Sequence, residues 1–458
     1  MKSFRSSKIN DPERVPPTRA RLRKHLSADA LLRTVGSCFC KIADHRTDDA
    51  DISLHDALMS GYAVFSLKAP SLLAFDKQRQ EEEHNLRSIF HIRRIPCDTQ
   101  MRTVLDGVNP EQLRRCYKAV FSKLQRGKAL EEMEYLNGYY LMLLDGTEYF
   151  SSEKLHSPFC MERINSETGK TSYYLQTLGV ALAHPDRKEV IPLMPEPISK
   201  QDGQTKNDCE LNASRRFISK FRKDHPHLMV IVCQDAISPN GPYIRFLKEH
   251  NCRFILSVKE SDHAYLFKQL DAAIESAEAQ DHAIVDTKDP DKTHGFRWVN
   301  GLSINASHKD VRVNLLEYWE LRGEKKKYFS WITDFILTPE NVYQIMRGGR
   351  ARWKIENETF NTLKNQGYNF EHNYGLGAKY LSMVFVTLMM VAFLVDQTQQ
   401  LSCTLFQSVW KKLGSKKALW ERIRALFDCF LFDSMEMLYL AILHGYQKDR
   451  PRILWDDS

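Results

Sequence analysis

Three acidic residues have types and positions suited to chemistry on a phosphate ester. Asp145 follows the apolar run GYYLMLL, Asp235 follows LMVIVCQ, and Glu356 lies in the segment RWKIENETFNTLK. An acidic side chain at the end of a buried strand is costly unless a cation meets it. Carboxylate oxygens are the ligands that hard divalent cations prefer, and two such ions can activate an attacking oxygen and stabilise a leaving one. The three carboxylates therefore predict a metal-dependent phosphoryl-transfer site.

The neighbours of the two aspartates predict where the carboxylates lie. Asp145 is followed by GTEYFSS and Asp235 by AISPNGP, both rich in turn-forming residues. These sequences predict that the chain leaves the sheet after each aspartate and exposes both carboxylates at its rim. Taken singly, each aspartate could equally be a turn or helix-capping residue.

The third carboxylate is expected on a helix. Arg352, Glu356 and Lys364 recur at helical spacing, and Ile355, Thr359 and Leu363 are expected to line one face. A lone Arg and Glu pair four residues apart is usually a surface salt bridge. Here Trp353, Ile355 and Phe360 predict a helix packed against the core, where a row of charges needs a reason.

The middle of the chain supplies the elements that must position these residues. A helix CELNASRRFISKFRKDH is predicted after the third of five strand-like runs, and another from 242 to 250 after the fourth. The pattern predicts an α/β fold with a mixed sheet, an antiparallel meander followed by strands joined through crossovers. The five runs are GYYLMLLD, SYYLQTLGVAL, EVIPLMP, LMVIVCQD and CRFILSVK.

Residues 136–400 form the expected catalytic domain, and a β-rich insertion at 271–335 interrupts it. This insertion is expected to begin as a helix, to become a loop by Asp289, and to contain three strands: GFRWVNGLSIN, VRVNLLEYWELR and KKYFSWITDF. The long apolar stretch 381–395 is too short to span a bilayer and predicts a buried core helix, with no membrane association. Residues 401–458 are expected to be helical, with a break at Gly414 and with Trp410 and Trp420 facing the core.

The N-terminal third suggests contact with nucleic acid. Residues 1–60 form a polar, basic segment with one short helical patch, 28–35, and residues 1–46 hold 11 Lys or Arg against four Asp or Glu. A solvated basic tail is the alternative to a polyanion-binding segment. Residues 61–135 are expected to be a helical DNA-binding region, with one helix from Asp98 to a stop at Gly107.

A second helix in this region, EQLRRCYKAVFSKLQRG, has an apolar face and a basic outer face. Basic helices joined by short turns suit a DNA reader of the helix-turn-helix type, although an amphipathic helix with a solvated face fits each one equally well. Its apolar face is expected to consist of Leu113, Tyr117, Val120, Phe121 and Leu124. The candidates for DNA contact are Arg102, Arg114 and Arg115.

Composition narrows the class of protein. The chain has 458 residues, enough for two to four domains, and a net charge of +7. Its ten cysteines are scattered without a CxxC pair, which favours a reducing, cytoplasmic location over a disulfide scaffold. His156 and Cys160 have metal-like spacing but lack a second pair. Glu210, which opens a helix, is a further candidate for the carboxylate site; the alternative is that it only interacts with the helix dipole.

The order Asp145, Asp235, Glu356, with RWKIENETFNTLK around the glutamate, resembles the DDE transposases of bacterial insertion sequences, in particular the IS4-like group with an RNase H-like catalytic domain. The resemblance covers about residues 136–400 and is strongest at 350–374 and at LLDGTEYFSS. The separations of 90 and 121 residues between successive carboxylates fit that arrangement, as does a β-rich insertion before the glutamate.

The helical signature of this family spaces a Tyr, an Arg, a Glu and a Lys. Arg352 and Glu356 match its spacing, and Lys364 comes one residue later than the pattern. Gly349 occupies the position of the Tyr. Glu358 is the alternative to Glu356, which aligns without a gap.

The resemblance implies a function. Asp145, Asp235 and Glu356 would bind Mg²⁺ or Mn²⁺ and hydrolyse the phosphodiester at the end of a mobile element. The freed 3′-hydroxyl would then attack target DNA, often after a hairpin forms at the cut end. Arg352 and Lys364 would grip phosphates near that end.

The family's other features imply further roles and partners. An aromatic residue of the insertion, with Trp331, Trp319 and Trp298 as candidates in that order, would stack on a flipped base or else lie in the core. The partner would be double-stranded DNA at terminal inverted repeats, in a protein associated with the bacterial nucleoid. Synapsis of two ends requires a homodimer, and residues 401–446 would form its interface or cap the same subunit. The rivals are a structure-specific nuclease and an inactive, transposase-derived DNA-binding protein.

Overall fold

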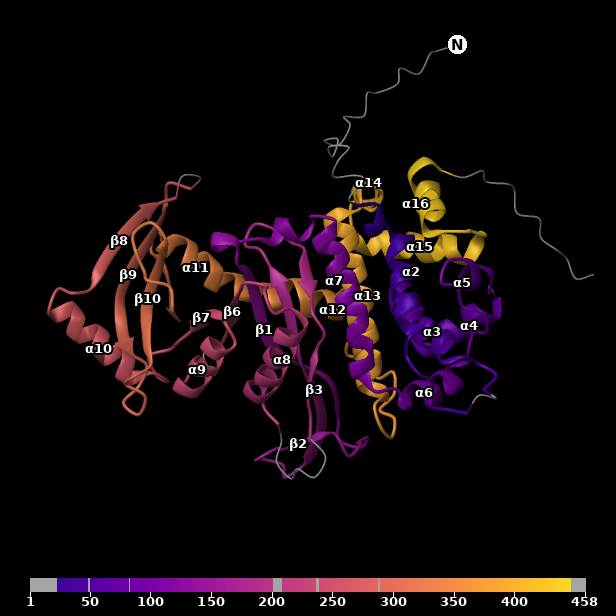
Figure 1. Cartoon of the computed structure of the whole chain (residues 1–458), viewed down its shortest axis with the longest axis horizontal. Coiled ribbons are helices and arrows are strands. Elements are labelled where there is room, and N and C mark those ends of the chain that lie inside the picture. The colour runs from indigo at the N-terminus through magenta and orange to yellow at the C-terminus, as the bar shows by residue number, and fades with distance from the viewer. Residues whose placement is uncertain are drawn as a thin grey trace, which may run out of the picture.

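A single mixed sheet runs through the middle of the molecule, with helices against it and a helical body at one end (Figure 1). This computed structural model describes residues 23–47, 50–81, 83–200, 208–235, 239–286 and 289–445. Eleven strands belong to the sheet in the described residues, in the order β2-β3-β1-β6-β7-β11-β10-β9-β8, with β4 and β5 beside β3. The prediction of an α/β fold with a mixed sheet is confirmed.

The centre of the sheet contains the five predicted strand runs. β1 pairs with β3 in antiparallel fashion and with β6 in parallel, and β6 pairs in parallel with β7. β4 and β5 pair antiparallel with β3, so the predicted meander and the predicted crossovers are both present. The strands are β1 (Tyr140–Ser152), β2 (Met161–Ile164), β3 (Thr171–Ala183), β4 (Val190–Pro192), β5 (Glu196–Ile198), β6 (Val230–Gln234) and β7 (Arg253–Ser257).

The prediction that the first strand ends at Asp145 is wrong. β1 continues to Ser152, because the residues after Asp145 remain paired with β3 as far as Tyr173. Only the parallel partner β6 stops here, and its last residue is Gln234. Asp145 therefore lies inside one long strand, at the point where the neighbouring strand has ended.

Two helices form the crossovers between the parallel strands, and a third helical segment carries Glu356. The crossovers are α8 (Glu210–Asp224) before β6 and α9 (Gly241–Glu249) between β6 and β7. The third segment is continuous but irregular. It consists of α11 (Val342–Arg350), a 3₁₀ turn (Ala351–Trp353), a π-helical turn (Ile355–Phe360) and α12 (Asn361–Asn365).

The predicted apolar face of this segment is confirmed, since Ile355, Thr359 and Leu363 are fully buried. The prediction that Trp353 packs against the core is wrong, because 52% of this residue is exposed. A π turn has more residues per turn than an α-helix, so the faces of the segment rotate away from ideal helical spacing.

The predicted β-rich insertion extends the same sheet. Its strands β9 (Lys292–Ser303), β10 (Arg312–Arg322) and β11 (Lys325–Thr333) match the three predicted runs, and β11 pairs antiparallel with β7. A fourth strand, β8 (Gln280–Val285), falls where a helix-like segment was expected. The helix expected here, α10 (Ala264–Glu275), lies mostly before that point.

The N-terminal helices form part of a packed body, with Leu31, Val35 and Leu58 fully buried. The expectation of a polar segment is therefore wrong for residues 23–60, while residues 1–22 lie outside the described residues. The α-helices are α2 (Ala28–Phe39), α3 (Leu54–Ser66), α4 (Leu72–Glu81), α5 (His84–Ser88), α6 (Asp98–Asp106) and α7 (Arg114–Arg126). Short 3₁₀ turns span Arg23–Leu26, Pro110–Leu113, Leu130–Met133 and Leu136–Gly138.

Two predicted helices of this region are confirmed. The helix α6 begins at Asp98, and Gly107 caps its C-terminus. The apolar face predicted for α7 is buried throughout, at Leu113, Tyr117, Val120, Phe121 and Leu124.

The C-terminal helices complete the helical body. The helix α13 (Leu381–Ser402) packs against α3, α6, α7 and β4. By length and composition α13 could cross a membrane, but 94% of its most apolar window is buried inside the molecule, as the prediction of a core helix requires. The helices α14 (Thr404–Leu413), α15 (Lys416–Cys429) and α16 (Met435–His444) follow.

The predictions for this C-terminal region are largely confirmed. Gly414 takes the left-handed conformation at the predicted break, with φ of 78°. Trp420 is buried as expected, whereas Trp410 is only half-buried. The helix α14 packs on α13 and α16 packs on α2, so this region caps its own chain.

Candidate active site between two parallel strands

The register of the parallel strands brings the two aspartates together. Tyr140 pairs with Val230 and Leu143 with Cys233, which is an offset of 90 residues along the whole pair. Asp145 and Asp235 are separated by the same offset. Neighbouring strands lie about 4.8 Å apart, so the two residues stand side by side just beyond the last paired residues. The sequence separation of 90 is thus the register of the strand pair.

Arg352 connects the glutamate to this pair. Its Nη1 lies 3.0 Å from Oδ2 of Asp145 and 3.0 Å from Oε1 of Glu356. The Arg352 side chain is only 9% exposed, whereas those of Asp145 and Glu356 are 19% and 43% exposed. One buried guanidinium therefore bridges two of the three predicted carboxylates, which a simple surface salt bridge does not do.

A fourth carboxylate, Glu210, belongs to the same cluster. It is the first residue of α8, and a Cβ added to Gly146 would lie 2.2 Å from its Oε1. Only a glycine beside Asp145 leaves room for this side chain. From the sequence alone Glu210 was a weaker candidate, because acidic residues are common in the first turn of a helix.

Burial and like charges dominate the electrostatics of the cluster. Burial raises the pKa of the Asp145 carboxyl to about 7, with Arg352 opposing the rise and Glu210 and Glu356 adding to it. The pKa of Glu210 is also raised, first by burial and then by Asp235. Arg352 thus bridges only Asp145 and Glu356, and the four carboxylates around it retain excess negative charge.

The geometry favours Glu356 over Glu358 as the third member. Glu358 acts on Lys354 and Lys416, where it opposes the lowering of their pKa by burial. Lys364 lies on the next helical turn, where its Nζ is 2.7 Å from a carboxylate oxygen of Glu371. Its predicted contact with DNA phosphate stays a prediction.

A cavity of about 340 Å³ opens beside the cluster. Its lining includes Asp235 and Arg352, and its wall is aromatic, with Tyr328, Trp331 and Trp353. The predicted Trp331 is only 2% exposed and stacks on Phe329, their rings 8° from parallel. Trp353, which was expected in the core, also lines this cavity and is far more exposed than Trp331.

Trp331 also accounts for the glycine at position 349. A Cβ on Gly349 would meet the indole Nε1 at 2.5 Å, so Trp331 fills the volume that a side chain there would need. The other two candidates for base stacking lie elsewhere in the insertion. Trp298 is 2% exposed, and Trp319 is half-buried with the guanidinium of Arg297 5.5 Å from its ring centroid.

The three arginines predicted to contact DNA from the helical body have different surroundings. Arg102 is exposed, and its guanidinium lies 3.7 Å from the Asp98 carboxylate. Arg115 donates to the backbone carbonyl of Lys41. Arg114 is 17% exposed and pairs with Glu111 and Asp224.

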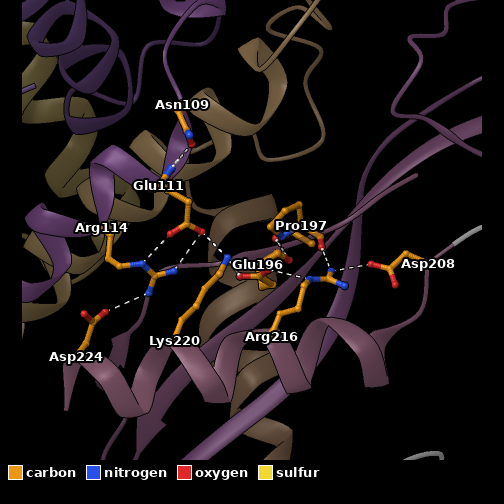
Figure 2. A network of polar contacts seen from close by, with 10 residues as sticks. Asn109, Glu111, Arg114, Glu196, Pro197, Asp208, Arg216, Lys220 and Asp224 are labelled. Atoms are coloured by element: carbon orange, nitrogen blue, oxygen red, sulfur yellow. Dashed lines mark hydrogen bonds and ion pairs between the residues drawn. The ribbon is translucent and has the colours of Figure 1, made fainter. Parts of the chain in front are cut away.

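Figure 2 shows that Arg114 belongs to a larger ionic network between the helical body and the sheet. Lys220 of α8 pairs with Glu196 of β5 at 2.9 Å, and Arg216 pairs with the same glutamate at 3.0 Å. Glu111 joins the network through Lys220 and Arg114. The network ties α7 to α8, so Arg114 has a structural role beside its predicted contact with DNA.

The donor set suits a hard divalent cation in its chemistry. Asp145, Asp235 and Glu356 supply carboxylate oxygens. The pKa of Asp145 is raised first by burial and then by the negative charges of Glu210 and Glu356, which a cation would offset. Within the described ranges, no group of three or more His, Cys, Asp or Glu side chains is arranged to hold a metal ion. Arg352 lies between Asp145 and Glu356 instead. Its guanidinium would have to release at least one of these carboxylates before both could bind a metal ion.

Comparison with known proteins leaves the function open. No family model matches the chain, and no curated protein matches it either.

Proposed function

We propose that this protein is a DNA transposase of the DDE type that cuts and joins DNA at terminal inverted repeats. The observation that carries the proposal is the carboxylate cluster. The register of the parallel strands β1 and β6 relates Asp145, within β1, to Asp235, directly after β6, and Arg352 joins Glu356 to Asp145. Acidic residues from two strands and a helix are the arrangement that metal-dependent phosphodiester chemistry needs.

The topology around the cluster supports an RNase H-like catalytic core. The antiparallel strands β3 and β1 are followed by the parallel strands β6 and β7, with α8 and α9 as crossovers. The first aspartate lies on β1, the second directly follows β6, and the glutamate lies on a helical segment that contacts β1 and β3. The β-rich insertion enters between the second and third carboxylates, as the resemblance implies.

The residues around the cluster have separate tasks in the proposed reaction. A bound Mg²⁺ or Mn²⁺ would supply Lewis-acid activation of the attacking oxygen and stabilise the leaving oxygen. Asp145, Asp235 and Glu356 would hold it, and Arg352 keeps the first and last of these in position. Once released from a carboxylate, the Arg352 guanidinium is suited to bind a DNA phosphate.

The aromatic wall of the adjoining cavity suits a nucleotide base next to the cleaved bond. Stacking on an aromatic ring tolerates any base, because every base presents a π face. Trp353 is the more exposed of the two tryptophans in this wall, whereas Trp331 is buried. The base would thus enter beside Asp235 and Arg352.

The joining step requires two element ends to be held together, which favours a homodimer. The helical C-terminal region is the expected contact, although it also caps its own chain. Its exposed apolar side chains support a contact with a second copy: Leu431 is 64% exposed, Met437 45% and Leu440 38%. We therefore retain a dimer with double-stranded DNA as the proposed assembly.

The test is a cleavage and joining assay. The purified protein is incubated with Mg²⁺, a target plasmid and labelled DNA carrying the inverted repeats that flank its coding sequence. Asp145→Asn, Asp235→Asn and Glu356→Gln should lose both cleavage and joining, while the matched control Glu358→Gln retains them. Cleavage without joining would identify a nuclease instead, and DNA binding without any cleavage would identify an inactive DNA-binding protein.

A further inference from the structure

A second cavity, of about 590 Å³, lies in the helical body. The helices α2 and α3 and the segment after α5 form its walls. In Figure 1 these helices lie on the side of α13 away from β1, so the cavity is separate from the carboxylate cluster. Its lining includes two arginines, Arg33 and Arg93, and two histidines, His55 and His91.

The walls of this cavity are held by short-range contacts. The Ser53 hydroxyl accepts a hydrogen bond from the Asp56 N–H at the start of α3. The buried Asp56 carboxylate accepts the backbone N–H groups of Arg93 and Arg94, at 3.0 Å and 3.2 Å. The segment carrying Arg93 is therefore fixed to α3 through its backbone, which leaves the Arg93 side chain available.

Gly36 sets the approach of α2 to α3. A Cβ at this position would lie 3.6 Å from Nε2 of His55, in ordinary contact with the ring. The imidazole thus lies against the backbone of α2. This packing forms the floor of the cavity from main chain and His55, and it leaves the cationic side chains around the rim.

The charge of the cavity is positive. Among the described residues, no ion pair joins Arg33 or Arg93 to an acidic side chain, and both residues are exposed. Asp56 is the one carboxylate among the described lining residues; it accepts two backbone N–H groups and lies 3.5 Å from Nδ1 of His55. Two guanidinium groups in one concave site, with no ion pair in the described part of the chain, suit an anionic ligand.

Other arginines nearby have acidic partners. Arg94 pairs with Asp51 at 3.1 Å, and Arg87 pairs with Glu83. Among the residues that the structure describes, Arg33 and Arg93 therefore differ from these neighbours in having no ion pair, and both line the same cavity. A guanidinium binds a phosphate through two parallel hydrogen bonds, which makes arginine the residue best suited to a phosphodiester.

We propose that this cavity binds the backbone phosphate of the DNA on which the carboxylate cluster acts. This inference rests on the proposed function, because that function makes double-stranded DNA the partner of the protein. The helical body would then hold the duplex through Arg33 and Arg93, at a distance from the reacting phosphate. The same chemistry would also admit a free phosphate or a nucleotide, and the experiment distinguishes these sources.

The test compares two double variants of equal charge. Arg33→Ala with Arg93→Ala removes the cavity guanidiniums, and Arg87→Ala with Arg94→Ala removes two paired arginines outside it. Duplex DNA binding is measured by fluorescence anisotropy over a range of salt concentrations, with thermal melting as a check of folding. We expect the cavity variant to bind about 100-fold more weakly, because each hydrogen bond to a charged group contributes roughly a factor of ten.

The salt dependence gives a second readout of the same variants. Each lost phosphate contact reduces the magnitude of the slope of log affinity against log salt by about 0.9. The cavity variant loses two such contacts, so the magnitude of its slope should be smaller than that of the parent by about 2. The control variant should bind within about threefold of the parent, with a smaller change in slope, since its arginines lie outside the cavity and have acidic partners. Parental DNA affinity in the folded cavity variant would overturn the proposal.

Two further measurements separate the remaining outcomes. If inorganic phosphate or a mononucleotide binds the parent and not the cavity variant, while both bind DNA equally, the cavity takes a free anion and the DNA assignment is overturned. If DNA binding depends on Arg33 and Arg93 but the parent never cleaves DNA, the proposed function fails and the cavity stands. If carboxylate-dependent cleavage is present but DNA binding ignores both arginines, the cavity proposal alone fails.

Discussion

Replacement of Arg352 by alanine tests the electrostatic description of the carboxylate cluster. The guanidinium contacts both Asp145 and Glu356 at 3.0 Å and is only 9% exposed. Its removal leaves Asp145 and Glu356 without their bridging cation. Breaking a fully buried pair costs about 3–5 kcal/mol. Because Glu356 is 43% exposed and solvent screens it, we expect a smaller loss of about 2 kcal/mol in the free energy of unfolding.

Divalent cations should reverse this loss. In Arg352→Ala the carboxylates can approach a single ion without a competing guanidinium, so Mg²⁺ should bind more tightly than in the parent. A ligand at 100 times its dissociation constant stabilises the folded state by about 2.7 kcal/mol. We therefore expect Mg²⁺ to restore most of the lost stability in the variant and to stabilise the parent less.

The assay is denaturant unfolding of both proteins with EDTA and with saturating Mg²⁺. Arg350→Ala is the matched control, because Arg350 lies on the same helical segment and pairs with Glu320, outside the cluster, at 2.6 Å. Mg²⁺ should not rescue this control. The reasoning is refuted if Arg352→Ala is as stable as the parent in EDTA, or if Mg²⁺ stabilises it no more than it stabilises Arg350→Ala.

Four further predictions follow from other contacts of the structure. The raised pKa of Asp145, about 7, means that protons compete with Mg²⁺, so titration calorimetry should find Mg²⁺ binding about tenfold weaker near pH 6 than near pH 8. Equal affinity at both pH values would contradict this. Gly146→Ala would place a methyl group against Glu210, so we expect a loss of about 1–3 kcal/mol in unfolding experiments and a loss of DNA cleavage; a fully active variant would remove Glu210 from the cluster. Trp353→Ala should change the unfolding free energy by less than about 0.5 kcal/mol, whereas Trp331→Ala should lower it by about 3–5 kcal/mol. Trp353→Ala should instead weaken DNA binding by about 1–3 kcal/mol, as measured by anisotropy. A large loss of stability in Trp353→Ala and a small one in Trp331→Ala would contradict the assigned burial. Burial lowers the pKa of His225 to about 4, below its unfolded value. The contribution of the neutral imidazole to the free energy of unfolding is therefore complete above the unfolded pKa and is lost as the pH falls. Between pH 7 and pH 5 the free energy of unfolding of the parent should fall by about 2 kcal/mol, a loss that His225→Asn should not show.

The sequence predicted the strands well, because short apolar runs bounded by turn-forming residues favour buried strands, whereas the longer apolar run at 381–395 favours a buried helix. It did not reveal that Asp145 lies within a strand, since the continuation of β1 depends on pairing with β3. The polar strand β8 was missed for a related reason. Its residues are half-buried or exposed in alternation and are held by β9 alone.

The candidate site was predicted in part. The three carboxylates and Arg352 were identified from residue types and spacing, and strand register with two hydrogen bonds brings them together. Glu210 ranked low because its proximity depends on the packing of α8 over Gly146, which local spacing does not encode. Trp353 was misassigned because the π turn that follows it shifts the helical faces. The exposed pair Arg33 and Arg93 was not singled out, because only the tertiary fold brings α2 and the segment after α5 together.

The central claim is that the carboxylate cluster cleaves DNA, and Asp235→Asn tests it most directly. Asp235 directly follows β6 and is not joined to Arg352 by an ion pair in the described part of the chain, so its replacement leaves the Arg352 bridge intact. The measurement is Mg²⁺-dependent cleavage and joining of labelled inverted-repeat DNA, with DNA affinity determined on the same samples. We expect the parent to cut and join this DNA, and Asp235→Asn to bind it with parental affinity but to cut none. Cleavage by Asp235→Asn at the parental rate would show that the carboxylate cluster is not the cleavage site.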